Sequence, residues 1–159
     1  MAPDTNPYPG LALQLAALLN GERECMANAA NASALIQLGV TDLNWVGFYF
    51  LRDGGLVLGP FQGRPACTRL PMGRGVCGTA ASRGEVVRVA DVHTFEGHIA
   101  CDSASRAEIV IPISVDGRLV GVLDLDSPVA GRFSEADEQG LETLVRVFVE
   151  ATDLSEWAT

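Results

Sequence analysis

The chain has 159 residues, of which 48% are hydrophobic and 19% are charged, and its formal net charge at neutral pH is -9. A chain of this length corresponds to about one domain, and its composition is that of a globular protein with a single hydrophobic core. The acidic balance excludes a basic surface for nucleic acid or for an anionic membrane.

The N-terminal segment predicts neither a secretory signal nor a membrane span. Residues 1–9 contain three prolines and are expected to form an irregular lead-in to a single domain over residues 10–159. They lack a basic segment before a long apolar core, and the apolar run Leu11–Leu19 is too short to cross a bilayer. We therefore expect a cytoplasmic protein, where four irregularly spaced cysteines would not form a permanent disulfide framework.

Two helices are predicted before the first strand. Apolar residues recur on one helical face at Leu11, Leu15, Leu18 and Leu19. Asn20-Gly21 ends this helix, and an Ala-rich helix is predicted over 22–38, with Gly39 just beyond its end. Cys25 lies in the second helix, where a lone cysteine is expected to be a small buried apolar side chain.

An aromatic and β-branched run over residues 44–51 predicts a strand, which Arg52-Asp-Gly-Gly55 turns into a second strand at 56–60. Period two divides the first strand into two faces. One face carries Val46, Phe48 and Phe50, and the other carries Trp45, Gly47 and Tyr49. The second face either lines a ligand site or packs against a covering helix.

Residues 73–82 predict a loop that enters a short helix, with Cys77 in its first turn. A helix N-terminus can lower the pKa of a thiol. After a strand at 86–89, a long connection over 91–106 holds Cys101, and connections of this length are commonly lids or binding loops. His93 and His98 are expected to be lid or surface residues.

The Asp116-Gly117 pair predicts a hairpin between strands at 108–115 and 119–126. A two-residue loop would set Ile109 opposite Asp124, which mixes apolar and charged residues on one face. We therefore favour a three-residue loop, which makes one face wholly apolar and sets Glu108 opposite Asp124, with Asp126 two residues on. An additional β-bulge would overturn this register.

The last segment, from Ser134, opens with a capping box at Ser134 and Asp137 and continues as an amphipathic helix. Two helices, a series of hairpins and a final covering helix predict an α+β fold, in which helices cover both sides of an antiparallel sheet.

Three carboxylates at one end of one sheet face, from Glu108, Asp124 and Asp126, repel one another unless they meet a cation or share protons. A solvated strand end is the simpler interpretation. Combined with paired cysteines, however, they suit sulfoxide reduction. A thiolate attacks the oxidised sulfur, a carboxyl group with a raised pKa protonates the departing oxygen, and a second thiol forms a disulfide. This chemistry requires neither a metal nor an organic cofactor.

Several motifs in order resemble the free methionine-(R)-sulfoxide reductases, which are single GAF domains. They are Gly59-Pro-Phe-Gln-Gly63, Ala66-Cys67, Gly73-Arg-Gly-Val-Cys-Gly78, Ala100-Cys-Asp-Ser103 and Gly121-Val-Leu-Asp-Leu-Asp-Ser127. The resemblance covers roughly Leu11 to Val149 and implies a GAF-like fold.

The resemblance also implies residue roles. Cys101 would be the attacking thiol and Cys67 the principal resolving thiol, with Cys77 as an alternative partner. The three acids would bind free methionine sulfoxide through its ammonium group and its sulfoxide oxygen, and Trp45 and Tyr49 would surround its methyl end. Thioredoxin is expected as the reductant, and a homodimer as the assembly.

Three alternatives remain open. GAF domains often bind small ligands without catalysis, and a thiol-based redox sensor would form a disulfide without reducing sulfoxides. A zinc site could be built from Cys67, Cys77, His98 and Cys101, although their spacing contains no Cys-x-x-Cys pair.

Overall fold

The computed structural model describes residues 6–99, 101 and 103–158. Along the chain its elements are α1 (Tyr8–Leu18), α2 (Cys25–Gly39), β1 (Trp45–Arg52), β2 (Gly55–Gly63), β3 (Arg69–Pro71), α3 (Gly75–Arg83), β4 (Val87–Val89), the 3₁₀ helix η1 (Val92–Thr94), β5 (Ala107–Val115), β6 (Arg118–Ser127) and α4 (Glu135–Ala151).

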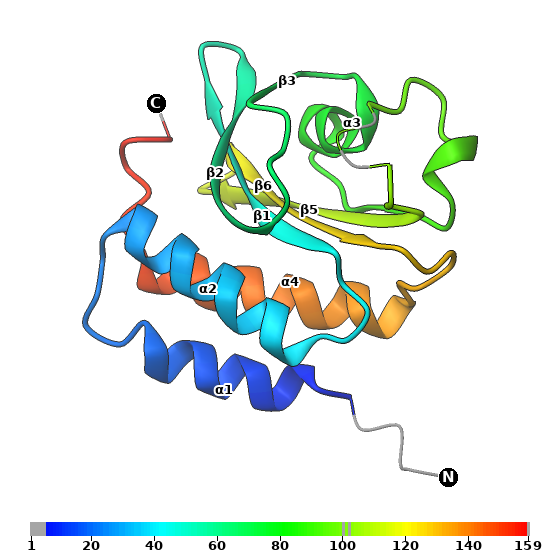
Figure 1. The fold of residues 1–159 in the computed structure, drawn as a ribbon. Coiled ribbons are helices and arrows are strands. Elements are labelled where there is room, and N and C mark those ends of the chain that lie inside the picture. The colour runs from blue at the N-terminus through cyan, green and yellow to red at the C-terminus, as the bar shows by residue number, and fades with distance from the viewer. Residues whose placement is uncertain (1–5, 100, 102, 159) are drawn as a thin grey trace, which may run out of the picture.

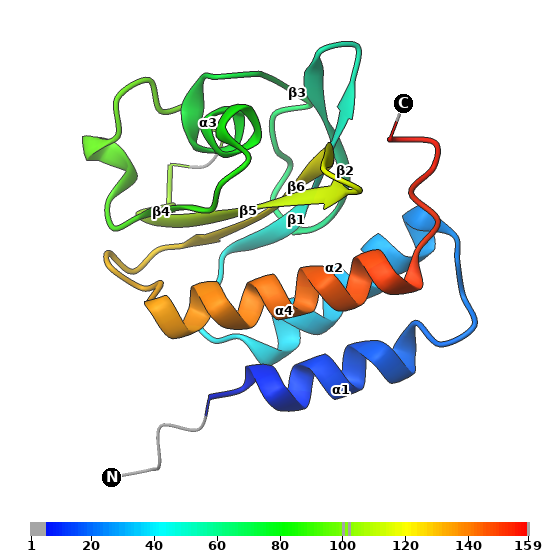
Figure 2. The same cartoon turned by 180° about the vertical axis from the view of Figure 1, so that it is seen from behind.

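The strands form one antiparallel sheet in the order β3-β2-β1-β6-β5-β4. Helices α2 and α4 cover one face, and α3 lies over the other (Figure 1). Helix α1 packs on α4 and α2 outside the sheet, so this side of the molecule has two helical layers (Figure 2). The predicted α+β fold, with helices on both sides of an antiparallel sheet, is confirmed.

Helix α1 begins at Tyr8, two residues before the predicted start of the domain. Pro9 does not prevent this, because a proline in the first turn of a helix removes no intrahelical hydrogen bond. Residues 1–5 of the predicted irregular segment lie outside the described residues, and the domain boundary itself stays a prediction. Within the described part of the chain, no helix is both long and apolar enough to cross a membrane.

Two separate apolar clusters lie on the two faces of the sheet. Val46, Phe48 and Phe50 of β1 point to the cluster shared with α1, α2 and α4. Trp45 and Tyr49 of the same strand point to the cluster under α3. The alternation predicted for this strand therefore holds, and Cys25 is buried in the first cluster, as expected of a small apolar side chain.

The register predicted for the β5–β6 hairpin is wrong by two residues. The loop has two residues, Asp116 and Gly117, both with positive φ as a type I′ turn requires. A bulge beside Ile113 then shifts the pairing, so that Glu108 lies opposite Asp126 and Val110 opposite Asp124. A shift of two residues leaves every side chain on its predicted face, and the acids still gather on one face.

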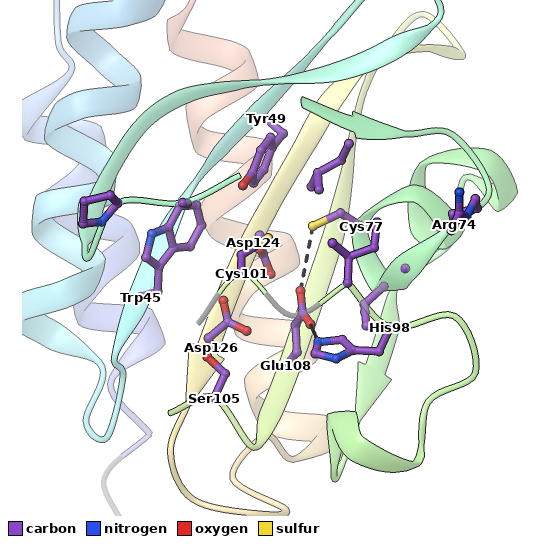
Figure 3. A pocket seen from close by; sticks show the side chains of 16 residues that line it. Trp45, Tyr49, Arg74, Cys77, His98, Cys101, Ser105, Glu108, Asp124 and Asp126 are labelled. Carbon is purple, nitrogen blue, oxygen red and sulfur yellow. Dashed lines mark hydrogen bonds and ion pairs between the residues drawn. The ribbon is translucent and has the colours of Figure 1, made fainter. Parts of the chain in front are cut away.

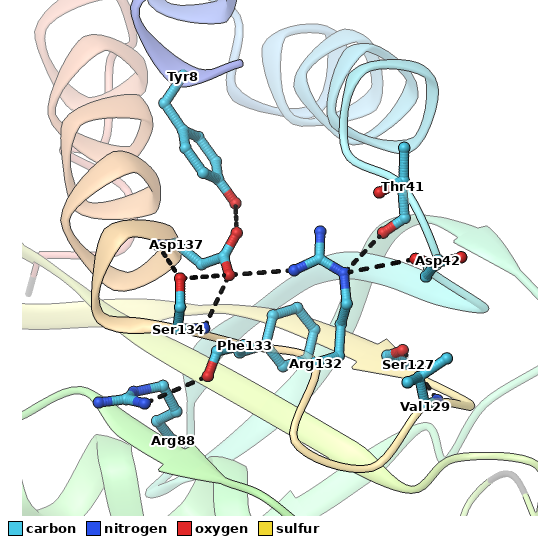
Figure 4. A network of polar contacts seen from close by, with 10 residues as sticks. All are labelled: Tyr8, Thr41, Asp42, Arg88, Ser127, Val129, Arg132, Phe133, Ser134 and Asp137. Carbon is cyan, nitrogen blue, oxygen red and sulfur yellow. Dashed lines mark hydrogen bonds and ion pairs between the residues drawn. The ribbon is translucent and has the colours of Figure 1, made fainter. Parts of the chain in front are cut away.

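A buried polar network joins α1 to the start of α4 (Figure 4). The Tyr8 hydroxyl donates to Asp137 Oδ1 at 2.7 Å, and Arg132 Nη1 donates to Asp137 Oδ2 at 3.0 Å. Ser134 and Asp137 also form the predicted capping box. Since these groups satisfy a carboxylate that is mostly buried, the network fixes α1 against the domain.

Candidate active site

The face of the sheet under α3 holds a pocket (Figure 3). Its walls come from β1, from α3, from the connection before β5, and from β5 and β6. Seven of the eight residues predicted for the site line it: Trp45, Tyr49, Cys77, Cys101, Glu108, Asp124 and Asp126. The eighth, Cys67, lies beside the pocket in the connection between β2 and β3. The sequence-based prediction therefore selected residues that the fold brings together.

Cys67 and Cys101 form a disulfide, with their Cα atoms 5.6 Å apart. The bond joins the β2–β3 connection to the segment that follows η1, and Cys101 lines the pocket at this junction. The Tyr49 hydroxyl donates to the Cys67 carbonyl oxygen at 3.0 Å and so anchors the same connection to β1. Two cysteines separated by 34 residues in the sequence thus lie close enough at the pocket wall to form a disulfide when an oxidant accepts their two electrons.

Cys77 is a free, buried thiol in the first turn of α3. The expectation that a helix N-terminus lowers its pKa is wrong. Burial raises the pKa of the Cys77 thiol, and the neighbouring Asp124 and Glu108 carboxylates raise it further. The Cys77 thiol donates to Glu108 Oε1 at 3.8 Å, so it serves as a protonated neighbour of that acid.

Glu108 and Asp124 are 6% and 5% exposed, respectively, so both are carboxyl groups removed from water. Burial raises the pKa of Asp124 to about 6. Burial also raises the pKa of Glu108 well above its ordinary value, and the charges of Asp124 and Asp126 add to the increase. Asp124 Oδ1 is buried, and no described residue lies within hydrogen-bonding geometry of it. The cluster can therefore hold protons near neutral pH or accept a cationic group.

The aromatic wall is built by β1 and held by contacts outside the pocket. Trp45 Nε1 donates to the Arg64 carbonyl oxygen at 3.2 Å, and the Trp45 ring stacks on Phe61 with centroids 5.3 Å apart. A Cβ atom at Gly47 would clash with the Phe61 Cβ atom and with Cη2 of the Trp45 ring. Glycine at this position therefore allows the two rings to stack beside the pocket.

His98 is a pocket residue that the sequence-based analysis assigned to a lid or the surface. Its Nε2 atom lies 4.0 Å from Glu108 Oε2, and its side chain is 16% exposed. Burial lowers the pKa of His98, and the nearby charge of His93 lowers it further. The one feature of the sequence that could have placed His98 in the pocket is its position three residues before Cys101.

Among the described residues, Cys77, Glu108 and Asp124 could hold a metal ion, since their ligand atoms lie within 4.8 Å of one another. The zinc site considered from the sequence was a different set. Two of its four members, Cys67 and Cys101, are bonded to each other here, and disulfide sulfurs are not thiolate ligands.

The chain is similar to known proteins over nearly its whole length. The GAF domain family matches residues 12–151. The chain is 56% identical over 141 residues to the free methionine-R-sulfoxide reductase of Escherichia coli K12, with coverage of 89% of this chain and 86% of that protein.

The fold is also similar to solved structures. The free methionine-R-sulfoxide reductase of Neisseria meningitidis in complex with its substrate has a TM-score of 0.89 and 42% identity, covering 96% of this chain and 92% of that chain. The fRMsr of Staphylococcus aureus in complex with its substrate has a TM-score of 0.87 and 46% identity, covering 91% of this chain and 94% of that chain.

Proposed function

The chain belongs to the GAF domain family and, within it, to the free methionine-(R)-sulfoxide reductases, and we propose that it reduces free L-methionine-(R)-sulfoxide to methionine. One observation carries the proposal beyond the resemblance. A disulfide lies at the wall of a pocket that also holds a protonatable acid and an aromatic wall. This combination provides the oxidised product state, the proton donor and the substrate site of one reaction.

In the first step, Cys101 is the attacking thiol. Its thiolate takes the oxygen atom of the sulfoxide, so that a sulfur–oxygen bond forms on Cys101 and the sulfur–oxygen bond of the substrate breaks. Cys101 is oxidised by two electrons to a sulfenic acid, and the sulfoxide sulfur is reduced to the thioether of methionine. The proton that the oxygen needs comes from Glu108, because its raised pKa keeps the carboxyl group protonated.

In the second step, the Cys67 thiol attacks the sulfur of the Cys101 sulfenic acid. A disulfide forms, and the oxygen leaves as water. Over the two steps, this water contains the substrate oxygen and accounts for the two protons that the thiols lose. The Cys67–Cys101 disulfide supports Cys67 as the principal resolving thiol. Cys77 is the alternative partner, although its buried and protonated thiol makes it the slower nucleophile.

Asp124 and Asp126 complete the recognition of a free amino acid. We assign them, with Glu108, to the ammonium group and the sulfoxide oxygen, because three carboxyl groups that line one pocket, two of them buried, favour a positively charged ligand. Trp45 and Tyr49 form the apolar wall for the methyl end. An N-acylated substrate would lack the ammonium group and lose this contact.

The same proposal covers the partners of the reaction. Thioredoxin reduces the Cys67–Cys101 disulfide, the protein acts in the cytoplasm as a homodimer, and no metal or organic cofactor takes part. Because thiols supply both electrons, the chemistry balances without a further redox group.

The test is turnover of free L-methionine-(R)-sulfoxide by the reduced protein, with the S epimer and the N-acetylated R form as comparison substrates and dithiothreitol as reductant. We expect reduction of the free R form only. Cys101→Ser should abolish methionine formation, whereas Cys67→Ser should stall after the first turnover. If folded, reduced protein converts none of the three compounds, the chain is a ligand-binding or redox-sensing GAF domain instead.

A further inference from the structure

His98 contacts Glu108 on the side opposite to Cys77. Figure 3 shows the imidazole against the Glu108 carboxyl group, with Nε2 4.0 Å from Oε2, while the Cys77 thiol contacts Oε1. The two oxygens of this buried acid therefore have different neighbours. One neighbour is a thiol that stays neutral, and the other is a ring that can become a cation.

The proposed reaction creates a charge problem at Glu108. When its O–H bond breaks and the proton moves to the sulfoxide oxygen, a carboxylate is left in a site that is 6% exposed. Asp124 and Asp126 are the charged groups that most oppose this ionisation after burial itself. An uncompensated buried carboxylate is strongly unfavourable, so the proton transfer needs a counter-charge beside Glu108.

We propose that His98 is a positioning residue that holds Glu108 and becomes its positive partner as the proton leaves, an inference that rests on the proposed reductase function. A positive charge within about 4–6 Å of a carboxylate favours its ionised form. The distance of 4.0 Å between Nε2 and Oε2 meets this condition. Since the side chain is 16% exposed, the ring can also exchange a proton with water.

The protons balance. The Cys101 thiol releases one proton to water when it becomes the thiolate, and His98 takes one proton from water. Glu108 keeps the electron pair of its broken O–H bond, and the sulfoxide oxygen gains the proton. The outcome is an imidazolium–carboxylate pair, which returns to the neutral pair when the proton moves from His98 to Glu108.

The other charged and titratable groups around the pocket do not replace His98. They come from the elements around the pocket: Tyr49 of β1, Arg74 and Cys77 of α3 and its N-terminal boundary, Asp124 and Asp126 of β6, and His93 and Cys101 of the connection before β5. His93 is exposed and lies outside the pocket lining. Arg74 is also exposed, and among the described residues no ion pair joins it to Glu108.

The test is a double-mutant cycle on the first turnover. Reduced protein is mixed with excess free methionine-(R)-sulfoxide without reductant, and the rate of methionine formation is followed. Gln can donate an N–H but cannot become a cation, so His98→Gln should slow the first turnover by about tenfold, with little change in KM. With Glu108→Gln in place, His98→Gln should cause no further loss, because His98 acts through Glu108.

His93→Gln is the matched control, and its rate should equal that of the wild type. An unchanged rate in His98→Gln, or additive losses in the double variant, would overturn the inference. If Glu108→Gln lowers the rate to that of the uncatalysed reaction, His98→Ala with added imidazole decides: restored methionine formation supports the proposal, and no restoration refutes it. Failure of the wild type itself to form methionine would refute the proposed function instead.

Discussion

Replacing Asp124 by asparagine should make the protein more stable and less active. Burial raises the pKa of Asp124 from 3.8 to about 6, so the folded state resists a charge that the unfolded state accepts. The sign follows directly: the carboxyl group favours folding fully below pH 3.8, and this contribution is lost as the pH rises to about 6. At about 1.4 kcal/mol per pKa unit, the ionised group costs about 3 kcal/mol of stability above that range.

Asparagine removes this cost because it has nearly the same shape and cannot ionise. We expect Asp124→Asn to raise the free energy of unfolding by about 3 kcal/mol at about pH 8 and by well under 1 kcal/mol at about pH 4. Urea unfolding of the disulfide form at the two pH values measures the difference. The same variant should lose at least about tenfold in kcat/KM, since a charged contact to the substrate is lost.

Asp53→Asn is the matched control, because Asp53 lies on the exposed β1–β2 turn with a positive φ that asparagine also adopts. Its stability relative to the wild type should not change between the two pH values. An equal loss of stability for Asp124→Asn at both pH values would mean that Asp124 is a structural hydrogen-bonding group, and the reasoning from burial would be wrong.

Two further predictions test the walls of the pocket and the scaffold. Gly47→Ala should raise KM, because a Cβ atom there would push against Trp45 and Phe61 and displace the aromatic wall; unchanged substrate kinetics would argue against that wall. Tyr8→Phe should lower the free energy of unfolding by about 1.5–3 kcal/mol in urea, since the buried Asp137 carboxylate loses a hydrogen bond. Its turnover should stay at the wild-type rate, and a slower enzyme would show that the network reaches the active site.

The faces of the sheet followed from local sequence patterns, whereas the pairing of its strands did not. Alternation in β1 and β5 depends on a period of two that no tertiary contact changes. The Glu108–Asp126 pairing depends on one extra residue in β6, and apolar residues on both sides of the bulge conceal its position. The prediction that the three acids lie on one face of the sheet is still correct, because a register error of two residues leaves each side chain on the same face.

The environment of Cys77 could not be obtained from its place in a helix. A helix N-terminus lowers a thiol pKa only if the thiol keeps some solvation, and here two carboxyl groups and burial act in the opposite direction. Those groups come from strands more than 30 residues away in the sequence. His98 was missed for a related reason, since only the folded connection brings its ring against Glu108.

The Cys67–Cys101 disulfide closes a covalent loop of 34 residues that contains β3, α3, β4 and η1. In the chain-entropy account, closing a loop of this size lowers the conformational entropy of the unfolded chain and so stabilises the folded state by about 4 kcal/mol. Every catalytic cycle would therefore close and open the loop that carries α3 and the two edge strands β3 and β4, while α1, α2 and α4 lie outside it. The resting oxidised protein should withstand heat and proteases better than the reduced protein, so resistance to unfolding would report the redox state of the cell.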